Sequence, residues 1–244
     1  MEYFPLFVDL RNRPVVVVGG GSVALRKVEL LLAASAHVTV VAPVIAASVR
    51  KLALAGAISV IHDSFSPAQL AGAALVIAAT DDATVNGEVA AAARAQGLWV
   101  NVVDDLVEST FIVPSIVDRS PIVVAVSSGG ASPMLARRVR ARIEALLPAG
   151  LGRLATLARS WRKTLRRRLV STSERRRFWD WFFDSPAARA ALDAGGQVEA
   201  LDLGATLAAF LAALQPQRGP LCLARAPSAA LVRSCWIRAC AWSN

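Results

Sequence analysis

The stretch PVVVVGGGSVALRKVELLL, residues 14–32, runs from a block of valines through three glycines into a periodic apolar segment. Consecutive valines that end at a glycine turn are typical of a strand buried on both faces of a sheet. After the turn, Ala24 and Val28 are four residues apart and lie on one face of a helix. The stretch therefore predicts a strand over 14–19, a glycine turn and a helix over 23–34.

The glycine turn has the spacing of a dinucleotide-binding fingerprint, in the order Gly19, Gly21 and Ala24. In that fingerprint the first glycine makes a tight turn, the second lets a pyrophosphate approach the backbone, and a small third residue lets helix and strand pack closely. The fingerprint also places an acid about 20 residues further on to bind the ribose. Residues 39–42 contain neither an acid nor an arginine, so the residues alone leave the choice between NAD and NADP open.

Strand and helix signals alternate through the first 105 residues. Further strands are predicted over 37–43, 73–82 and 98–105, and a helix over 85–97. This alternation is typical of a parallel sheet covered by helices on both faces. We expect an α/β fold that begins with a Rossmann domain.

The pattern changes after Asp105. Residues 109–130 predict two strands joined by a turn at 118–121, and residues 132–148 predict a helix capped by Ser132. Such an added strand pair and helix often form a dimer interface. From 151 onward the pattern is helical, with Trp161, Trp179, Trp181 and Phe182 as packing anchors. The predicted boundaries are 1–113 for the Rossmann NAD-binding domain, 114–150 for a dimerisation segment, 151–214 for a small all-α domain and 215–244 for a tail.

Composition argues against several classes of protein. The chain of 244 residues is 55% hydrophobic, yet its apolar runs end well before the ~18 residues that a membrane span needs. The N-terminus lacks the pattern of a signal peptide, so we expect a cytoplasmic protein without a membrane partner. All three cysteines lie beyond residue 221, and His37 and His62 have no ligand spacing around them, so no structural metal site is predicted.

The basic excess lies in the C-terminal part of the chain. Residues 1–150 hold twelve basic and twelve acidic side chains, whereas the segment 153–177 holds ten basic residues and one acid, Glu174. Such a run is typical of a solvated helix face, and it also suits an anionic ligand or a nucleic acid. No aromatic platform or known nucleic-acid motif accompanies the arginines, so we expect no nucleic-acid partner.

Polar residues follow the predicted strands, at the edge where open parallel sheets bind ligands. Asp81 and Asp82 precede a helix and are predicted to cap it. Asn101, Asp104 and Asp105 precede no obvious helix. For the two acids, a role as general base and a role as a cap therefore stay open.

A further polar group, Ser127, Ser128 and Gly129, precedes the helix predicted over 132–148. Its amide and hydroxyl groups are suited to cradle an anionic group. The same residues also suit a flexible turn before a capped helix. The sequence leaves both interpretations open.

Five motifs in order resemble one family: LFVDLRNRPVVVVGGGSVALRK, IAATDDATVN, NVVDD, TFIVPSIVDRSPIVVAVSSGGASPMLAR and SERRRFWDWFF. Together they closely resemble the N-terminal module of the fused bacterial siroheme synthases, from about residue 1 to 214. In that family the module is a precorrin-2 dehydrogenase and sirohydrochlorin ferrochelatase. The resemblance implies a homodimer with a Rossmann domain, a dimerisation segment and a helical domain.

The resemblance implies two reactions at one site. NAD would take a hydride from precorrin-2 to give sirohydrochlorin, and ferrous iron would then be inserted as a substrate to give siroheme. The family's key acid falls on Asp104, a base for protons that leave the macrocycle in both steps. The cofactor contacts fall on the glycine turn with Ala24, on Ser22 and Val23, and on Pro43 and Val44.

From their position after the predicted strands, we expect substrate contacts on two loops, at Asn101, Asp105, Ser127, Ser128 and Gly129. Ser128 matches a serine that the family can carry phosphorylated. A phosphate there would place negative charge in a cleft for a polycarboxylate and would oppose substrate binding. The carboxylates of precorrin-2 also give the arginines of 153–177 a ligand to steer.

The chain departs from the family after residue 214. The fused enzymes continue into a uroporphyrinogen-III methyltransferase domain with a glycine-rich loop, where this chain has LARAP. We interpret residues from about 217 onward as out-of-frame or truncated, with a genuine short tail as the alternative, and expect no methyltransferase activity. Two further readings of the module are a precorrin-2 dehydrogenase that leaves chelation to another protein, and an inactive dimerisation partner.

Overall fold

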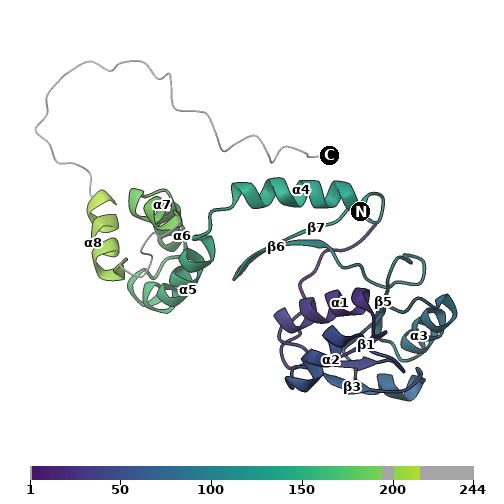
Figure 1. Ribbon diagram of the computed structural model, residues 1–244. Helices are drawn as coiled ribbons and strands as arrows, with labels where there is room; N and C mark the ends of the chain where they lie inside the picture. The colour runs from purple at the N-terminus through teal and green to yellow at the C-terminus, as the bar shows by residue number, and fades with distance from the viewer. Residues whose placement is uncertain (1, 194–200, 215–244) are drawn as a thin grey trace, which may run out of the picture.

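A computed structural model describes residues 2–193 and 201–214. Its first part is a five-stranded parallel sheet in the order β3-β2-β1-β4-β5, flanked by helices (Figure 1). The strands are β1 (Pro14–Val18), β2 (His37–Val41), β3 (Ser59–Ile61), β4 (Leu75–Ala78) and β5 (Trp99–Val102). The helices are α1 (Ser22–Ala33), α2 (Ala47–Leu54), the 3₁₀ helix η1 (Pro67–Leu70) and α3 (Ala83–Ala95). The predicted α/β fold is confirmed.

The valines of β1 alternate between two cores. Val15 and Val17 pack with Ala24 and Val28 of α1, whereas Val16 and Val18 pack with the cluster that contains Val89 of α3. Because successive side chains of a strand point to opposite faces, four consecutive valines require a helix on each face of the sheet. The sheet order reverses between β1 and β4, and a ligand site is expected at the carboxyl ends of these two strands.

The second part is a hairpin covered by a helix. Strands β6 (Ser115–Arg119) and β7 (Ile122–Val126) are antiparallel, and α4 (Pro133–Leu146) packs on them. The predicted cap of α4 is confirmed, because the Ser132 hydroxyl accepts a hydrogen bond from the Leu135 amide at 3.2 Å. Figure 1 shows this part between the parallel sheet and the remaining helices.

The third part is helical, as predicted. It contains α5 (Leu151–Arg168), α6 (Thr172–Phe183), α7 (Pro186–Leu192) and α8 (Leu203–Leu214). Its core is aromatic: Phe178 is fully buried, and its ring lies edge-on to Phe210 with 5.3 Å between centroids and stacks on Phe182. Trp161 packs on Phe182 with centroids 5.1 Å apart and is buried, whereas Trp179 and Trp181 are partly buried.

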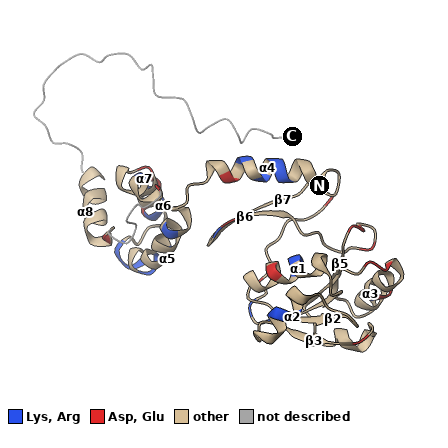
Figure 2. Ribbon diagram, in the orientation of Figure 1, with Lys and Arg blue, Asp and Glu red and all other residues tan. Residues whose placement is uncertain are grey.

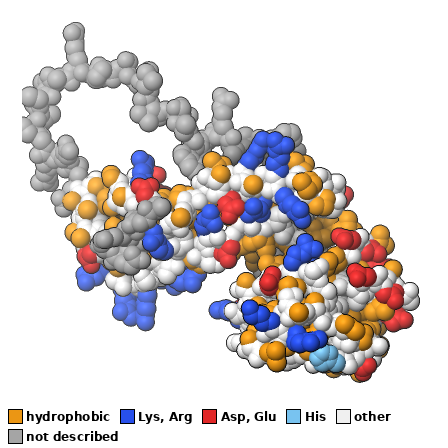
Figure 3. All heavy atoms as spheres, viewed as in Figure 1, with side chains coloured by type: hydrophobic (Ala, Val, Ile, Leu, Met, Phe, Trp, Pro, Cys, Tyr) orange, Lys and Arg blue, Asp and Glu red, His pale blue; other side chains and the backbone are white. Residues whose placement is uncertain are grey.

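The basic side chains of α5 are solvated. All seven of them are exposed: Arg153, Arg159, Arg162, Lys163, Arg166, Arg167 and Arg168. Figure 2 shows Lys and Arg on α5 and on α4, and Figure 3 shows blue side chains over these two helices. This arrangement fits a solvated face that is open to an anionic ligand.

Over residues 2–193 and 201–214, no helix is long and apolar enough to cross a membrane. The same residues contain no group of three or more His, Cys, Asp and Glu side chains placed to hold a metal ion. The predicted tail, residues 215–244 with its three cysteines, lies outside the described residues. The predicted domain boundaries stay predictions.

Candidate functional site

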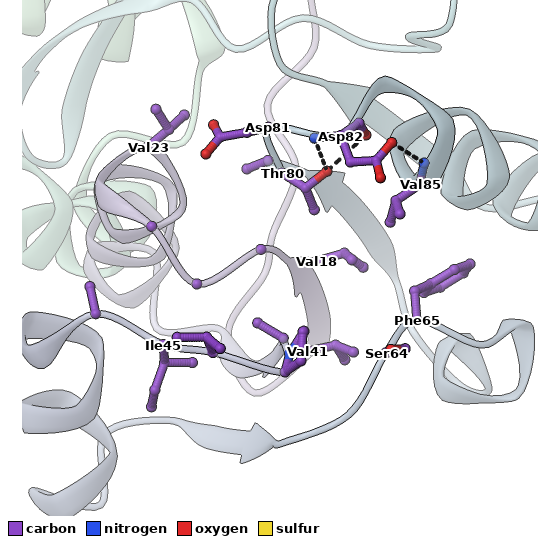
Figure 4. Close-up of a pocket in the computed structure, with 18 of the residues that line it drawn as sticks. Val18, Val23, Val41, Ile45, Ser64, Phe65, Thr80, Asp81, Asp82 and Val85 are labelled. Atoms are coloured by element: carbon purple, nitrogen blue, oxygen red, sulfur yellow. Dashed lines mark hydrogen bonds between the residues drawn. The ribbon is translucent and has the colours of Figure 1, made fainter.

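A cavity of about 620 Å³ lies at the carboxyl ends of β1, β2 and β4, where the sheet order reverses (Figure 4). The glycine turn and the first residues of α1 form one side, and the segment after β2 forms another. Residues after β3 and β4 complete the lining. Among the predicted cofactor residues, the lining includes Gly19, Gly21, Ser22, Val23, Pro43 and Val44.

The three glycines of the turn have different surroundings. Gly19 has a φ of 127°, and a Cβ there would overlap the carbonyl oxygen of Ala79. A Cβ on Gly20 would overlap the carbonyl oxygen of Val44. A Cβ on Gly21 would meet nothing within 4 Å, so the space above Gly21 is open to a ligand. Ala24, the small third residue, is fully buried and packs α1 against the sheet instead of lining the cavity.

The N-terminus of α1 faces this open space without a cap. Within residues 2–193 and 201–214 no side chain accepts a hydrogen bond there, and the first bond of the helix runs from the Leu25 amide to the Gly21 carbonyl oxygen at 3.0 Å. The amide groups of Ser22 and Val23 therefore lack a helical acceptor. These donors and the positive end of the helix dipole suit a bound anion such as a pyrophosphate.

The carboxylates of the cavity come from the end of β4. Asp82 caps α3 as predicted, since its carboxylate accepts from the Thr84 amide at 2.8 Å and the Val85 amide at 3.3 Å. Asp81 makes no hydrogen bond among the described residues, and Figure 4 shows its carboxylate turned toward Val23. The expected capping role therefore belongs to Asp82, and Asp81 is left facing the cavity.

A buried amide holds the chain between β4 and α3. Asn86 is 9% exposed, and its side-chain oxygen accepts from the Thr80 hydroxyl at 2.8 Å and the Thr80 amide at 3.2 Å. Its side-chain nitrogen donates to the Thr80 carbonyl oxygen at 3.0 Å. The sequence places Thr80 among the polar residues at the end of this strand, but Asn86 was not predicted as a partner, although it lies in the quoted motif IAATDDATVN.

Asp104 lies in the loop after β5 and outside the cavity lining. Its φ of 60° puts a non-glycine residue in the left-handed region, at a backbone cost of about 1 kcal/mol that surrounding contacts must offset. The described residues give its exposed carboxylate no hydrogen bond, so it is available to a ligand. Asp105 differs, because its carboxylate accepts from the Glu108 amide at 3.0 Å inside the same loop.

Asn101 is also used within the fold. It is 7% exposed, and its side-chain nitrogen donates to the Phe111 carbonyl oxygen at 3.1 Å. This bond fixes the chain after the loop to β5. Its predicted contact with a substrate stays a prediction.

Sequence reasoning missed Lys27, a half-buried residue of α1. Burial and, to a lesser extent, the charge of Arg26 lower the pKa of Lys27, and the nearby Asp104 carboxylate opposes this shift. Lys27 forms no ion pair within 4.0 Å in the described part of the chain. Lys27 lies one helical turn after Val23 on α1. The helix therefore places the positively charged side chain of Lys27 one turn beyond the cavity lining, where it interacts with Asp104.

The structure brings the two predicted substrate loops together. Gly130 has a φ of 88°, and a Cβ there would overlap the Leu106 side chain from the loop of Asp104. Within the second loop the Ser127 hydroxyl accepts from the Gly129 amide, and the Ser128 hydroxyl accepts from the Ser132 amide, both at 3.0 Å. Ser128 is half-buried next to the start of α4.

Comparison with known families divides the chain in the same order as the structure. A family described as NAD(P)-binding matches residues 6–115, a sirohaem biosynthesis protein central region matches 119–146, and a sirohaem synthase dimerisation region matches 150–202. The chain is similar to the siroheme synthases. It corresponds to the N-terminal part of these enzymes, as the five motifs predict.

Individual siroheme synthases agree with this assignment. Siroheme synthase 1 of Pectobacterium atrosepticum is 52% identical over 199 residues, which are 82% of this chain and 41% of the relative. The siroheme synthase of Tolumonas auensis is 54% identical over 186 residues, 76% of this chain and 39% of the relative. The chain therefore spans about two fifths of the length of these relatives.

A solved structure named SirC, precorrin-2 dehydrogenase, has the same fold. It superposes with a TM-score of 0.65 and 24% sequence identity, over 86% of this chain and 100% of that one. At this identity the likeness concerns the fold.

Proposed function

We propose that this chain oxidises precorrin-2 to sirohydrochlorin with NAD and then inserts ferrous iron, as a substrate, to give siroheme. The observation that carries the proposal is the open space above Gly21 beside the uncapped N-terminus of α1. This space belongs to the cavity at the carboxyl ends of β1, β2 and β4, and Asp104 follows the carboxyl end of the neighbouring strand β5. The names of the siroheme synthase relatives and of the SirC structure supply the reaction class. The methyltransferase reaction is not proposed for this chain.

The cavity favours NAD over NADP. In the described part of the chain its lining contains two carboxylates, Asp81 and Asp82, and no lysine or arginine. The segment after β2, which would border the adenosine, lines the cavity with Pro43, Val44, Ile45 and Ala46, so a 2′-phosphate there would lack a counter-charge. Gly19, Gly21, Ser22 and Val23 would hold the pyrophosphate, Ala24 would support the turn by packing, and Pro43 and Val44 would border the adenosine.

Asp104 is the proposed base of both steps. Bound NAD supplies the hydride acceptor for the first step, a two-electron oxidation in which one further proton must leave the macrocycle. The exposed Asp104 carboxylate has no hydrogen bond among the described residues and would take that proton. In the second step Fe²⁺ displaces two pyrrole protons, and the same carboxylate would accept them one after the other.

The proposed substrate contacts come from both loops. Asn101, Asp105, Ser127, Ser128 and Gly129 border the side of the site where Leu106 meets Gly130. Ser128 phosphorylation would add negative charge near the start of α4 and oppose a polycarboxylate substrate. A Ser128→Asp variant that turns over precorrin-2 normally would remove this regulatory role.

We further propose a cytoplasmic homodimer. The match of residues 150–202 to a dimerisation region supports the dimer, and no described helix suits a membrane span. The exposed arginines of α5 would steer the carboxylates of the substrate toward the site.

The test is anaerobic turnover of precorrin-2 by the full chain with NAD⁺, with NADH and sirohydrochlorin followed by absorbance, before and after addition of Fe²⁺. Formation of NADH and faster appearance of siroheme than in buffer support both activities. NADH without faster iron insertion favours the second candidate, a dehydrogenase alone. Absence of both NAD binding and turnover would favour an inactive dimerisation partner.

A further inference from the structure

The edge of β5 is closed by Ser109 and Thr110 instead of another strand, through both of their side chains and the Thr110 backbone amide. β5 is the last strand of the sheet and pairs with β4 on one side. On its other side the Val102 amide donates to the Ser109 hydroxyl at 2.9 Å, and the Val100 amide donates to the Thr110 hydroxyl at 2.8 Å. Two consecutive hydroxyl residues thus satisfy donors that an edge strand otherwise leaves open.

Ser109 makes a second link that Thr110 does not make. Its oxygen lies 2.6 Å from the Asp105 carbonyl oxygen and 3.2 Å from that of Val102. A hydroxyl has a single proton, so Ser109 donates mainly to the nearer Asp105 oxygen while it accepts from the Val102 amide. The serine therefore joins both ends of the Val102–Asp105 turn that contains Asp104.

Further hydrogen bonds within the turn and from α3 reinforce this loop. The Asp105 amide donates to the Val102 carbonyl oxygen at 3.2 Å. Arg94 of α3 binds the Glu108 carboxylate at 2.7 Å and the Val107 carbonyl oxygen at 3.2 Å. Since Asp104 itself has no side-chain hydrogen bond among the described residues, its left-handed conformation depends on these neighbours.

We propose that Ser109 is a positioning residue for Asp104, which it holds in the left-handed turn through its bonds to Val102 and Asp105. The inference rests on the proposed function, in which Asp104 takes protons from the substrate. Loss of the hydroxyl leaves the Val102 amide without its acceptor and frees the Asp105 carbonyl, so the Asp104 carboxylate samples several positions.

The expected effect is on turnover and not on the cofactor. A misplacement of about 1 Å at a reacting group lowers rates by about a hundredfold, so Ser109→Ala lowers kcat for NADH formation by about tenfold to a hundredfold. The KM for NAD⁺ stays within about twofold of wild type, because Ser109 does not line the cavity. Ser109→Thr keeps the hydroxyl and restores most of kcat.

Thr110→Val is the matched control. It removes the same kind of edge hydrogen bond one pair further from Asp104 and keeps the backbone bond from the Thr110 amide to the Val100 carbonyl oxygen at 2.8 Å. Its effect on urea unfolding should resemble that of Ser109→Ala, whereas its kcat stays near wild type.

The experiment measures kcat, the KM values, NAD⁺ binding by calorimetry and urea unfolding for wild type, Ser109→Ala, Ser109→Thr and Thr110→Val. A loss of kcat confined to Ser109→Ala, with NAD⁺ affinity retained, supports the positioning role. Equal kcat in Ser109→Ala and wild type overturns the positioning role. An equal loss of kcat in Ser109→Ala and Thr110→Val also overturns it. If wild type binds NAD⁺ but turns over no precorrin-2, the proposed function fails first, and amide hydrogen exchange at residues 102–109 still tests whether Ser109 holds the turn.

Discussion

The glycine turn allows cofactor binding and folding to be separated by two adjacent substitutions. A methyl group on Gly21 meets nothing within 4 Å, and the φ of −85° at this position suits alanine. A methyl group on Gly20 overlaps the Val44 carbonyl oxygen and lies 2.9 Å from Ile45 Cα, which are both backbone atoms. Gly21→Ala should therefore weaken NAD⁺ binding, whereas Gly20→Ala should lower the stability of the fold.

The magnitudes follow from these surroundings. Gly21→Ala should change the free energy of unfolding by less than about 0.5 kcal/mol. Alanine lowers the conformational entropy of the unfolded chain, which stabilises the fold and offsets the weaker preference of alanine for the N-cap position. Its methyl group lies where the pyrophosphate approaches, and we expect the Kd for NAD⁺ to rise at least tenfold, or about 1.4 kcal/mol. Gly20→Ala should lower the free energy of unfolding by about 1–3 kcal/mol, because backbone atoms must move.

Urea unfolding and calorimetric titration with NAD⁺ measure the two effects on the same samples. Wild-type NAD⁺ affinity in a folded Gly21→Ala variant would refute the assignment of the turn to the pyrophosphate. Wild-type stability of Gly20→Ala would refute the close packing of the turn against the segment after β2. A loss of affinity in Gly21→Ala together with a large loss of stability would also count against the account.

Three further predictions concern other parts of the chain. Asn86→Ala should lower the free energy of unfolding by about 2–3 kcal/mol, because it leaves the Thr80 amide and carbonyl without partners; an unchanged urea midpoint would contradict the network. Lys27 has a pKa below its ordinary 10.5, so as pH rises toward that value Lys27 loses its proton in the folded chain before it does so in the unfolded chain, and the stability of wild type rises relative to that of Lys27→Met. The exposed Lys51→Met variant is the control, and identical pH profiles of stability for wild type and Lys27→Met would exclude the buried charge. Phe178→Ala removes a fully buried ring and should destabilise the helical part by about 3–5 kcal/mol in tryptophan-detected unfolding, where a loss below about 1 kcal/mol would contradict the packing.

The parts of the fold that the sequence predicts best have strong local patterns. The valines of β1 and the glycine turn are recognisable because burial on both faces and a tight turn each demand particular residue types. The hairpin of β6 and β7 and the Ser132 cap of α4 also follow from local signals. Predicted strand ends were less accurate, since β4 covers Leu75–Ala78 instead of 73–82.

Short elements escaped prediction. Neither α2 nor β3 is predicted from the sequence, because their eight and three residues contain too few periods of the hydrophobic pattern to detect. Ser64 and Phe65 follow β3 and line the cavity, so they were missed with it. The strand order brings the segments after β2, β3 and β4 together. It therefore locates Ser64 and Phe65 at the cavity only once β3 is known.

The loop after β5 depends on contacts that no local pattern reveals. Asp104 and Asp105 are equivalent in the sequence, yet one is left-handed with an exposed carboxylate and the other bonds the Glu108 amide. Ser109 donates to the Asp105 carbonyl oxygen and Arg94 donates to the Val107 carbonyl oxygen, and both bonds join parts of the loop that are apart in the sequence. The resemblance selected Asp104, and the structure supplies a physical reason why the two acids differ.

The most direct test of the central claim compares wild type with Asp104→Asn in both reactions under anaerobic conditions. Asparagine keeps a side chain of similar size and tolerance for the left-handed region but cannot take a proton at neutral pH. We expect Asp104→Asn to keep normal NAD⁺ affinity, whereas the rates of NADH formation and of iron insertion both fall at least a hundredfold. Wild-type rates for both steps in a variant that binds NAD⁺ would contradict the claim that one carboxylate serves the two reactions.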